Sequence, residues 1–253
     1  MINLLNNLPR EKVSLPIFAS TYTTDPHYLD LGTSHSNLFL YELSYLDNCD
    51  YPINREKKIR LLNKFNIEID TLSNFVITYN LLSDNDLING FSKNRESLIL
   101  NIQNILNIDK FYTDKKRVFI FENPSILNEI ISLNIDETVI ITSGMPNTAL
   151  YLLFDKLVLS NKLYYNGDFD PEGLLIAQKL KDKYDDLILS CYDAGDYEAC
   201  ISSNKISNQS LKKLNNIHSD ELLEMKELLF EKKQAAYQEN NKENIIKYVK
   251  NIL

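Results

Sequence analysis

Three apolar runs in the second half of the chain are each followed by a proline-containing loop and a helical segment. The runs are "RVFIF" (117–121), "TVIIT" (138–142) and "KLYYNG" (162–167), and a fourth, "LILSCY" (187–192), comes after them. Unbroken apolar strands that alternate with helices are typical of a parallel sheet covered on both faces. The sequence therefore predicts an α/β fold with a mostly parallel sheet flanked by helices.

The loops after these runs carry prolines where helices begin. Pro124, Pro146 and Pro171 lie at or near the first helical turn, where a missing backbone N–H costs least. Each proline thus marks the carboxyl end of a strand. Parallel strands joined by right-handed crossovers place these ends at one edge, where open α/β sheets bind ligands. The residues expected to converge there are Glu122, Ser143, Gly144, Asp168 and Asp170.

Asp168 and Asp170 stand two positions apart in the stretch "YYNGDFDPEG" (164–173). Because Asp170 precedes a proline, it is steered toward an extended conformation. Residues two apart in an extended segment point the same way, with Phe169 facing the core. Carboxylates at close range raise one another's pKa unless a cation lies among them. Hard oxygen ligands suit Mg²⁺ or Mn²⁺.

Ordinary structural roles explain the same residues equally well from spacing alone. Asp170 can cap the following helix, Asp168 can close a turn, and Glu122 can be a solvated acid at a strand end. Ser143 and Gly144 can bind a phosphate at a helix N-terminus or form a plain turn. We interpret Glu172 as a structural acid, because the first helical turn favours negative charge.

The first hundred residues have a different pattern. Helical spacing is found at 36–46 and 55–65, and strand-forming residues occupy 74–82. We expect a smaller, mixed and mainly helical N-terminal region at 1–110, for which a winged-helix-like arrangement is one candidate, and a catalytic domain at 111–253. Near the C-terminus, Ser219 is a good N-cap for a helix whose spacing runs through Ala236 and which carries Glu239 toward the sheet.

Charge and hydropathy exclude some classes of protein. The 253 residues carry a net charge of −8, which argues against coating of nucleic acid by bulk electrostatics but not against a nuclease. An apolar run long enough for a membrane span is not found, nor is a signal-peptide pattern, so a cytoplasmic location and no membrane contact are expected. The three cysteines lack a CxxC pair and indicate neither a disulfide framework nor a zinc site.

Glu122 at one strand end and a DxD motif at a later one resemble the Toprim fold of topoisomerases, primases and related nucleases. In order along the chain, "RVFIFENPSIL", "ITSGMPNTALYLLFDKL", "LYYNGDFDPEGLLIA" and "YQEN" are similar to the C-terminal region of the nuclease subunit of Wadjet plasmid-defence systems. That subunit is related to the A subunit of topoisomerase VI. The upstream stretches "LPIFASTYTTDPHYLDLG" and "LLNKFNIEIDTLSNFVITYNLL" also resemble this family.

The resemblance implies a DNA endonuclease that hydrolyses phosphodiester bonds with Mg²⁺ or Mn²⁺. By this analogy Glu122, Asp168 and Asp170 are metal ligands, and Glu239 is a further ligand or base; an exposed helical Glu is the alternative for Glu239. The implied partners are double-stranded DNA and a condensin-like SMC complex, and a homodimer is one assembly we consider. Members of the family usually carry a further N-terminal arm, and this chain corresponds to the region after it.

Two other functions compete with the endonuclease. One is a non-catalytic module that keeps the fold and binds DNA or partner proteins. The other is a different phosphoryl-transfer activity of the Toprim class, such as synthesis of nucleotide bonds. No tyrosine lies in a motif that indicates a covalent intermediate, so hydrolysis is the reaction we expect.

Overall fold

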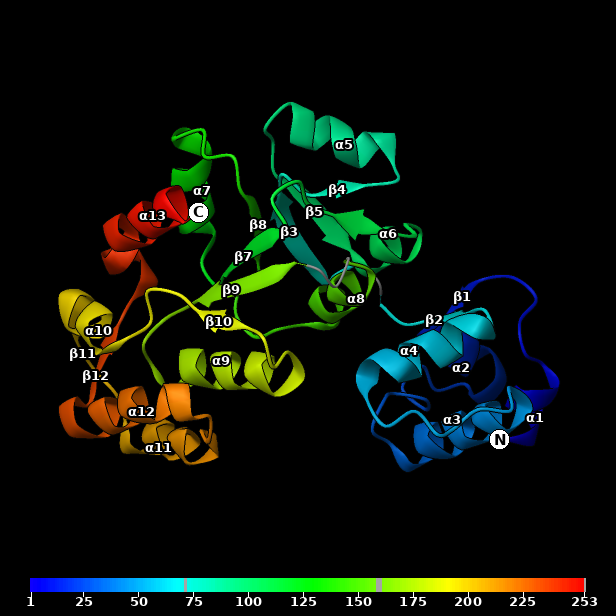
Figure 1. The fold of residues 1–253 in the computed structure, drawn as a ribbon. Coiled ribbons are helices and arrows are strands. Elements are labelled where there is room, and N and C mark those ends of the chain that lie inside the picture. The colour runs from blue at the N-terminus through cyan, green and yellow to red at the C-terminus, as the bar shows by residue number, and fades with distance from the viewer. Residues whose placement is uncertain (71, 158–160, 253) are drawn as a thin grey trace. The chain divides into compact units, whose positions relative to one another are not determined.

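The chain divides into two compact units, Met1–Asn74 and Phe75–Leu253. The computed structural model describes residues 1–70, 72–157 and 161–252 (Figure 1). The division lies earlier in the chain than the expected one at 110/111. The reason is that the strand-forming segment at 74–82 supplies a strand to the large sheet of the second unit rather than to a separate N-terminal region.

The first unit is mainly helical, as expected. Buried apolar side chains such as Phe18, Phe39 and Leu43 hold its helices together. Its two short strands pair in parallel, whereas the wing of a winged helix is an antiparallel hairpin, and the described residues of this unit form no such hairpin. Its elements are α1 (Ile2–Asn6), β1 (Val13–Ser14), α2 (Leu15–Thr23), α3 (Ser34–Leu46), α4 (Arg55–Lys64) and β2 (Ile67–Glu68).

The second unit is built on a six-stranded sheet with the order β10-β9-β7-β8-β3-β5. Its strands are β3 (Phe75–Tyr79), β5 (Leu98–Asn101), β7 (Arg117–Phe121), β8 (Thr138–Ile141), β9 (Lys162–Asn166) and β10 (Ile188–Leu189). The neighbours β10, β9, β7 and β8 are parallel, and β3 is antiparallel to both β8 and β5. The predicted α/β fold with a mostly parallel sheet is confirmed.

Helices cover both faces of this sheet, as Figure 1 shows. Phe119, Phe121 and Tyr164 point to one face, where they pack against α7 (Pro124–Ser132) and α13 (Lys242–Asn251). On the other face lies α9 (Pro171–Lys183), and α8 (Thr148–Lys156) connects β8 to β9. As expected, the three prolines lie at or near the first helical turn. Pro124 and Pro171 are the first residues of α7 and α9, and Pro146 directly precedes the N-cap of α8.

Shorter elements complete the second unit. They are β4 (Leu82–Ser83), α5 (Asp86–Lys93), α6 (Ile102–Leu106), β6 (Phe111–Tyr112), α10 (Ala194–Cys200), β11 (Ile201–Lys205), α11 (Asn208–Leu211), η1 (Lys212–Asn216), α12 (Asp220–Lys232), β12 (Gln234–Ala236) and η2 (Gln238–Asn241). Among the described residues, no helix has the length and hydropathy of a transmembrane span.

The predicted helix through Ala236 is too long. It begins after Ser219 as expected but ends at Lys232, because Lys233 adopts a left-handed conformation with φ 54°. Residues 234–236 then form β12, which pairs with β11. Ala236 also exchanges two backbone hydrogen bonds with Phe169, at 2.9 and 3.1 Å. Strand pairing with a distant segment therefore overrides the helical spacing.

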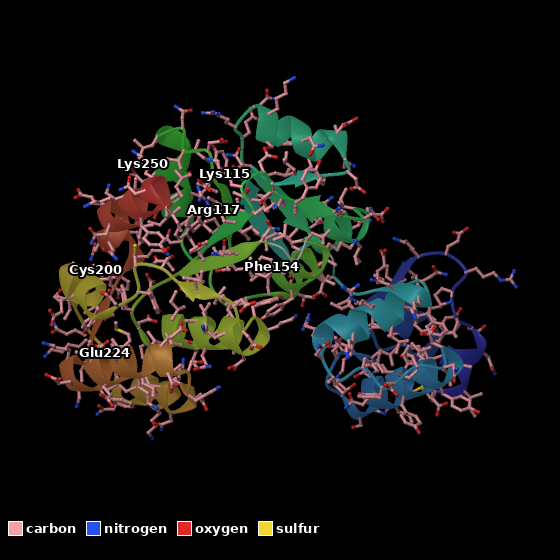
Figure 2. All side chains as sticks on the ribbon, in the orientation of Figure 1. Lys115, Arg117, Phe154, Cys200, Glu224 and Lys250 are labelled. Carbon is pink, nitrogen blue, oxygen red and sulfur yellow. The ribbon has the colours of Figure 1, made fainter. Side chains whose placement is uncertain are left out.

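A buried ion pair lies at the amino end of the parallel strands. Glu137 is only 4% exposed, and both of its oxygens accept hydrogen bonds from the Arg117 guanidinium at 2.6 and 2.8 Å. The Lys115 ammonium lies 3.2 Å from the same carboxylate but is more exposed than Arg117 (Figure 2). Arg117 thus compensates most of the cost of burying the Glu137 charge.

We expect Arg117→Met to lower the free energy of unfolding by about 3 kcal/mol, because it leaves a buried carboxylate with one partly exposed partner. Urea denaturation followed by circular dichroism measures this loss. Lys115→Met is the matched control and should cost less than about 1 kcal/mol. Equal losses for the two variants would contradict this account of the ion pair.

Candidate metal centre

Four acidic residues from distant parts of the chain influence one another at the carboxyl edge of the sheet. Burial raises the pKa of Glu122 to about 7, and the charges of Asp168, Asp170 and Glu239 add to the effect. Burial also raises the pKa of Asp168 to about 6, with Glu239 and Asp170 contributing. Every charged group that shifts these two pKa values is itself a carboxylate. These acids are therefore close enough to influence one another's pKa, while their role as metal ligands stays a prediction.

Three segments of the chain carry the four acids. Glu122 directly follows β7, Asp168 and Asp170 lie between β9 and α9, and Glu239 lies in η2. Phe169, between the two aspartates, is fully buried and stacks on Tyr192 at 4.6 Å, so it faces the core as predicted. The Tyr192 hydroxyl donates to the carbonyl oxygen of Asp168 at 2.7 Å, which holds the loop against the core.

Hydrogen bonds within the protein engage all four carboxylates. A backbone hydrogen bond from Asp168 lowers the pKa of Glu122 against the larger effect of burial. Asp170 Oδ1 accepts from the Gly173 N–H at 2.8 Å and so caps α9. Asp168 Oδ1 accepts from the Gln238 N–H at 2.8 Å, and Glu239 Oε1 accepts from the Asn123 side-chain amide. In this arrangement, no group of three or more His, Cys, Asp or Glu side chains in the described part of the chain is set out as a metal site.

Several buried oxygen atoms around Glu122 have no hydrogen-bond partner. Glu122 Oε2 is buried and has no hydrogen-bond partner in the structure, and the same holds for three nearby hydroxyls at the strand ends and the start of α7, those of Ser125, Thr142 and Tyr165. Buried polar atoms in proteins nearly always have a partner, which can be an ion or a water molecule. Carboxylate oxygens are the donors that a hard divalent cation prefers. The chemistry of these side chains therefore suits such an ion, while their positions in the described part of the chain do not form a three-ligand site.

Two glycines make room for this arrangement. A Cβ on Gly167 would lie 2.2 Å from the Tyr165 hydroxyl and 3.0 Å from Glu122 Oε2. A Cβ on Gly173 would lie 2.1 Å from the backbone oxygen of Asp168. Side chains at these positions would displace the acids. Close packing around the centre therefore requires glycine at both positions of the segment "NGDFDPEG".

A buried glutamine that the sequence analysis did not single out links the acids. Gln238 is 0% exposed, and its side chain accepts from the Asn123 N–H at 2.9 Å. The same side chain donates to the backbone and side-chain oxygens of Asn166 at 2.8 and 2.7 Å. Gln238 thus ties the ends of β7 and β9 to the turn that carries Glu239. Its only signal in the sequence is a position beside Glu239.

The loop after β8 differs from the other two. Ser143 is exposed and has a left-handed backbone with φ 53°, and Gly144 has φ 95°. Neither residue lies in the first turn of α8, whose N-cap is Asn147. A phosphate-binding role for Ser143 and Gly144 stays a prediction. Glu172 lies in the first turn of α9 and forms an ion pair with Lys213, which agrees with a structural role.

The fold and the centre define a mixed α/β protein with an acidic cluster at the carboxyl ends of parallel strands. The family described as "Protein of unknown function C-terminus (DUF2399)" matches residues 98–249, more than half of the chain. The chain belongs to this family, and the matched region contains all four acids. A second family, "Protein of unknown function N-terminus (DUF3323)", matches residues 1–83. Comparison with curated proteins found no match.

We expect Glu122→Gln to stabilise the metal-free protein more at pH 8 than at pH 5. The folded-state pKa of Glu122 is about 7, above the ordinary value near 4.3. Wild-type stability is therefore fully present below pH ~4 and is lost as the pH rises through 7, by roughly 3 to 4 kcal/mol in all. Gln does not ionise and avoids this loss. Urea denaturation in EDTA at both pH values measures the difference.

The surface variant Glu224→Gln, on α12 (Figure 2), is the control for this experiment and should behave like the wild type at both pH values. A stabilisation by Glu122→Gln of the same size at pH 5 and pH 8 would show that ionisation of Glu122 is not its cause.

We expect Gly173→Ala to lower the free energy of unfolding by about 2 kcal/mol, because its methyl group would collide with the Asp168 backbone. Gly90, within α5, is the matched helical glycine with nothing near its missing Cβ. Gly90→Ala should raise stability by about 0.5 to 1 kcal/mol. Thermal denaturation compares the two variants. If Gly173→Ala left the free energy of unfolding unchanged, the loop before α9 would have to shift without cost.

Proposed function

We propose that the chain is a divalent-metal-dependent DNA endonuclease that hydrolyses phosphodiester bonds. The observation that carries the proposal is the buried and unpartnered oxygen of Glu122, which lies among three further carboxylates. Without a cation this arrangement is electrostatically unfavourable, because burial and mutual repulsion both oppose ionisation. A bound cation would reverse the sign of the local charge and make the ionised carboxylates favourable.

Glu122, Asp168 and Asp170 would hold Mg²⁺ or Mn²⁺ in this centre. When bound, such an ion supplies a Lewis acid that activates water and neutralises charge on the scissile phosphate. Asp168 and Asp170 each use Oδ1 for a backbone N–H. These hydrogen bonds fix the direction of both carboxylates. Glu239 lies at the exposed rim, where the Asn123 amide orients it, and it is the candidate for a further ligand or base.

The biological setting comes from the resemblance to the Toprim-fold nuclease subunit of Wadjet plasmid-defence systems. On that basis the substrate is double-stranded DNA, the partner is a condensin-like SMC complex, and the place of action is the cytoplasm. Homodimerisation is part of the same proposal. The net charge of −8 is compatible with it, because a nuclease that a partner complex delivers to DNA does not need a strongly basic surface.

A non-catalytic DNA-binding or scaffolding subunit is the second candidate. The observation in its favour is that Asp168, Asp170 and Glu239 all have hydrogen-bond donors within the protein. In that case the acids would cap a helix and tie down a turn, and no ion would be needed. Ion binding distinguishes the two candidates before any activity is measured.

We expect the purified chain to nick supercoiled plasmid DNA in Mg²⁺ or Mn²⁺, and Glu122→Gln and Asp168→Asn each to reduce the rate at least 100-fold. The reason is that each variant removes a negative ligand from the ion. Agarose gel electrophoresis of a time course measures the rate. Glu224→Gln on the surface should nick at the wild-type rate. Nicking that survives both centre variants would contradict the proposal.

Thermal denaturation against Mn²⁺ concentration separates the endonuclease from the scaffold. A ligand that binds only the folded chain stabilises it by about 2.7 kcal/mol at one hundred times its Kd. The endonuclease requires such a shift and its loss in Asp168→Asn. A wild-type chain that Mn²⁺ does not stabilise at any concentration supports the scaffold.

A further inference from the structure

Two buried hydroxyl groups lie beside Glu122, and the sequence motifs draw attention to neither. Thr142 follows β8, and Tyr165 is the fourth residue of β9. Thr142 is 1% exposed and Tyr165 is 0% exposed. Both side-chain oxygens are buried without a hydrogen-bond partner in the structure. Burying a hydroxyl in this state is unfavourable, so each oxygen calls for a functional explanation.

The strand register places Thr142 and Gly167 on either side of Glu122. Phe121 is paired with Ile141 of β8 and with Asn166 of β9. The residues that follow at the next level are Glu122 after β7, Thr142 after β8 and Gly167 after β9. The Thr142 N–H donates to the Phe121 carbonyl at 3.0 Å, which extends the ladder to this level. Thr142 is thus the neighbour of Glu122 along the sheet edge.

Side-chain alternation puts the groups on the same face. Phe121, Ile141 and Tyr164 belong to the apolar cluster under α7 and α13. The residue that follows each of them points to the opposite face, and these residues are Glu122, Thr142 and Tyr165. On that face the Tyr165 hydroxyl occupies the place that a side chain on residue 167 would take, which Gly167 leaves free. The Tyr165 hydroxyl and Glu122 Oε2 lie 2.2 and 3.0 Å from the position that a Cβ would take.

We infer that Thr142 and Tyr165 are positioning residues of the candidate metal centre. The Tyr165 hydroxyl donates a hydrogen bond to the Glu122 carboxylate when that carboxylate binds the ion. The Thr142 hydroxyl, on the other side of Glu122, would donate to an oxygen atom of whatever the centre binds. This inference rests on the proposed function, since it assigns the two hydroxyls to the same ion-binding centre.

Packing alone does not explain the two hydroxyls. The ring of Tyr165 makes an edge contact with the ring of Tyr192, with centroids 6.0 Å apart, and Phe would make the same contact. Valine has almost the shape of threonine and would fill the site of Thr142. If packing were the only requirement, Phe and Val would serve better, because neither buries an unpartnered hydroxyl.

The test is Mn²⁺ binding to the full chain, measured by isothermal titration calorimetry, together with metal-free stability in EDTA. We expect Tyr165→Phe and Thr142→Val each to weaken Mn²⁺ binding about tenfold, as loss of a supporting hydrogen bond at a metal site does. Neither variant should lower metal-free stability. Thr142→Ser keeps the hydroxyl and should retain wild-type affinity.

Two matched controls have hydroxyls that already have partners. Thr138, at the opposite end of β8, donates to the Asn80 carbonyl at 2.8 Å. Tyr112 donates to the Ser83 carbonyl at 3.0 Å. Thr138→Val and Tyr112→Phe should therefore lower stability and leave Mn²⁺ affinity unchanged, which is the opposite of the result expected at the centre.

The outcomes separate this inference from the proposed function. Wild-type Mn²⁺ affinity in both Tyr165→Phe and Thr142→Val would overturn the inference and leave the endonuclease proposal standing. Reduced metal-free stability without any change in affinity would overturn it too, because the hydroxyls would then be structural. A wild-type chain that binds no Mn²⁺ contradicts the proposed function itself.

Discussion

The arrangement of the carboxyl edge of the sheet depends on the hydrogen bonds of the Gln238 side-chain amide. This amide is fully buried, and it bonds to residues 115 and 72 positions away, Asn123 after β7 and Asn166 at the end of β9. Asn166 in turn donates to the carbonyls of Ser190 and Cys191 at the end of β10. A fully satisfied buried network of this kind specifies one arrangement, since any partial version leaves costly unpaired groups.

The acidic centre takes its geometry from this network. The backbone N–H of Gln238 holds Asp168, and the next residue, Glu239, is thereby fixed at the rim near Asn123. Two acids from different parts of the chain therefore share one anchor. A shift of the turn at residues 238–241 would therefore move both acids together.

Much of the fold could be predicted because its signals are local. Apolar runs and prolines at helix starts indicate β7, β9 and the helices after them without knowledge of any partner. The division at 74/75 could not be predicted this way, because β3 joins the sheet through antiparallel pairing with β8, some sixty residues along the chain. The end of α12 at Lys232 could not be predicted either, because it also depends on a distant partner. The residues after it, 234–236, pair with β11 and with Phe169.

The sequence points to the acids of the candidate site but not to its uncharged residues. Carboxylates at strand ends stand out by residue type, whereas Gln238, Thr142 and Tyr165 are ordinary residues whose importance comes from burial and register. Burial is not visible in a single sequence when the buried group is polar. The unpartnered state of a hydroxyl is visible only once every neighbour has been placed.

The two interpretations that spacing left open for Asp170 are compatible with each other. A carboxylate has two oxygens, and capping of α9 uses only Oδ1. The cap also fixes the direction in which the other oxygen points, as the Gln238 N–H does for Asp168. Glu122 differs, because the buried Oε2 has no partner at all and the pKa is raised to about 7. Both aspartates thus accept hydrogen bonds from the protein, whereas one buried oxygen of Glu122 has no partner and is repelled by the neighbouring carboxylates. A divalent cation at that point would offset both the burial of the Glu122 charge and the repulsion.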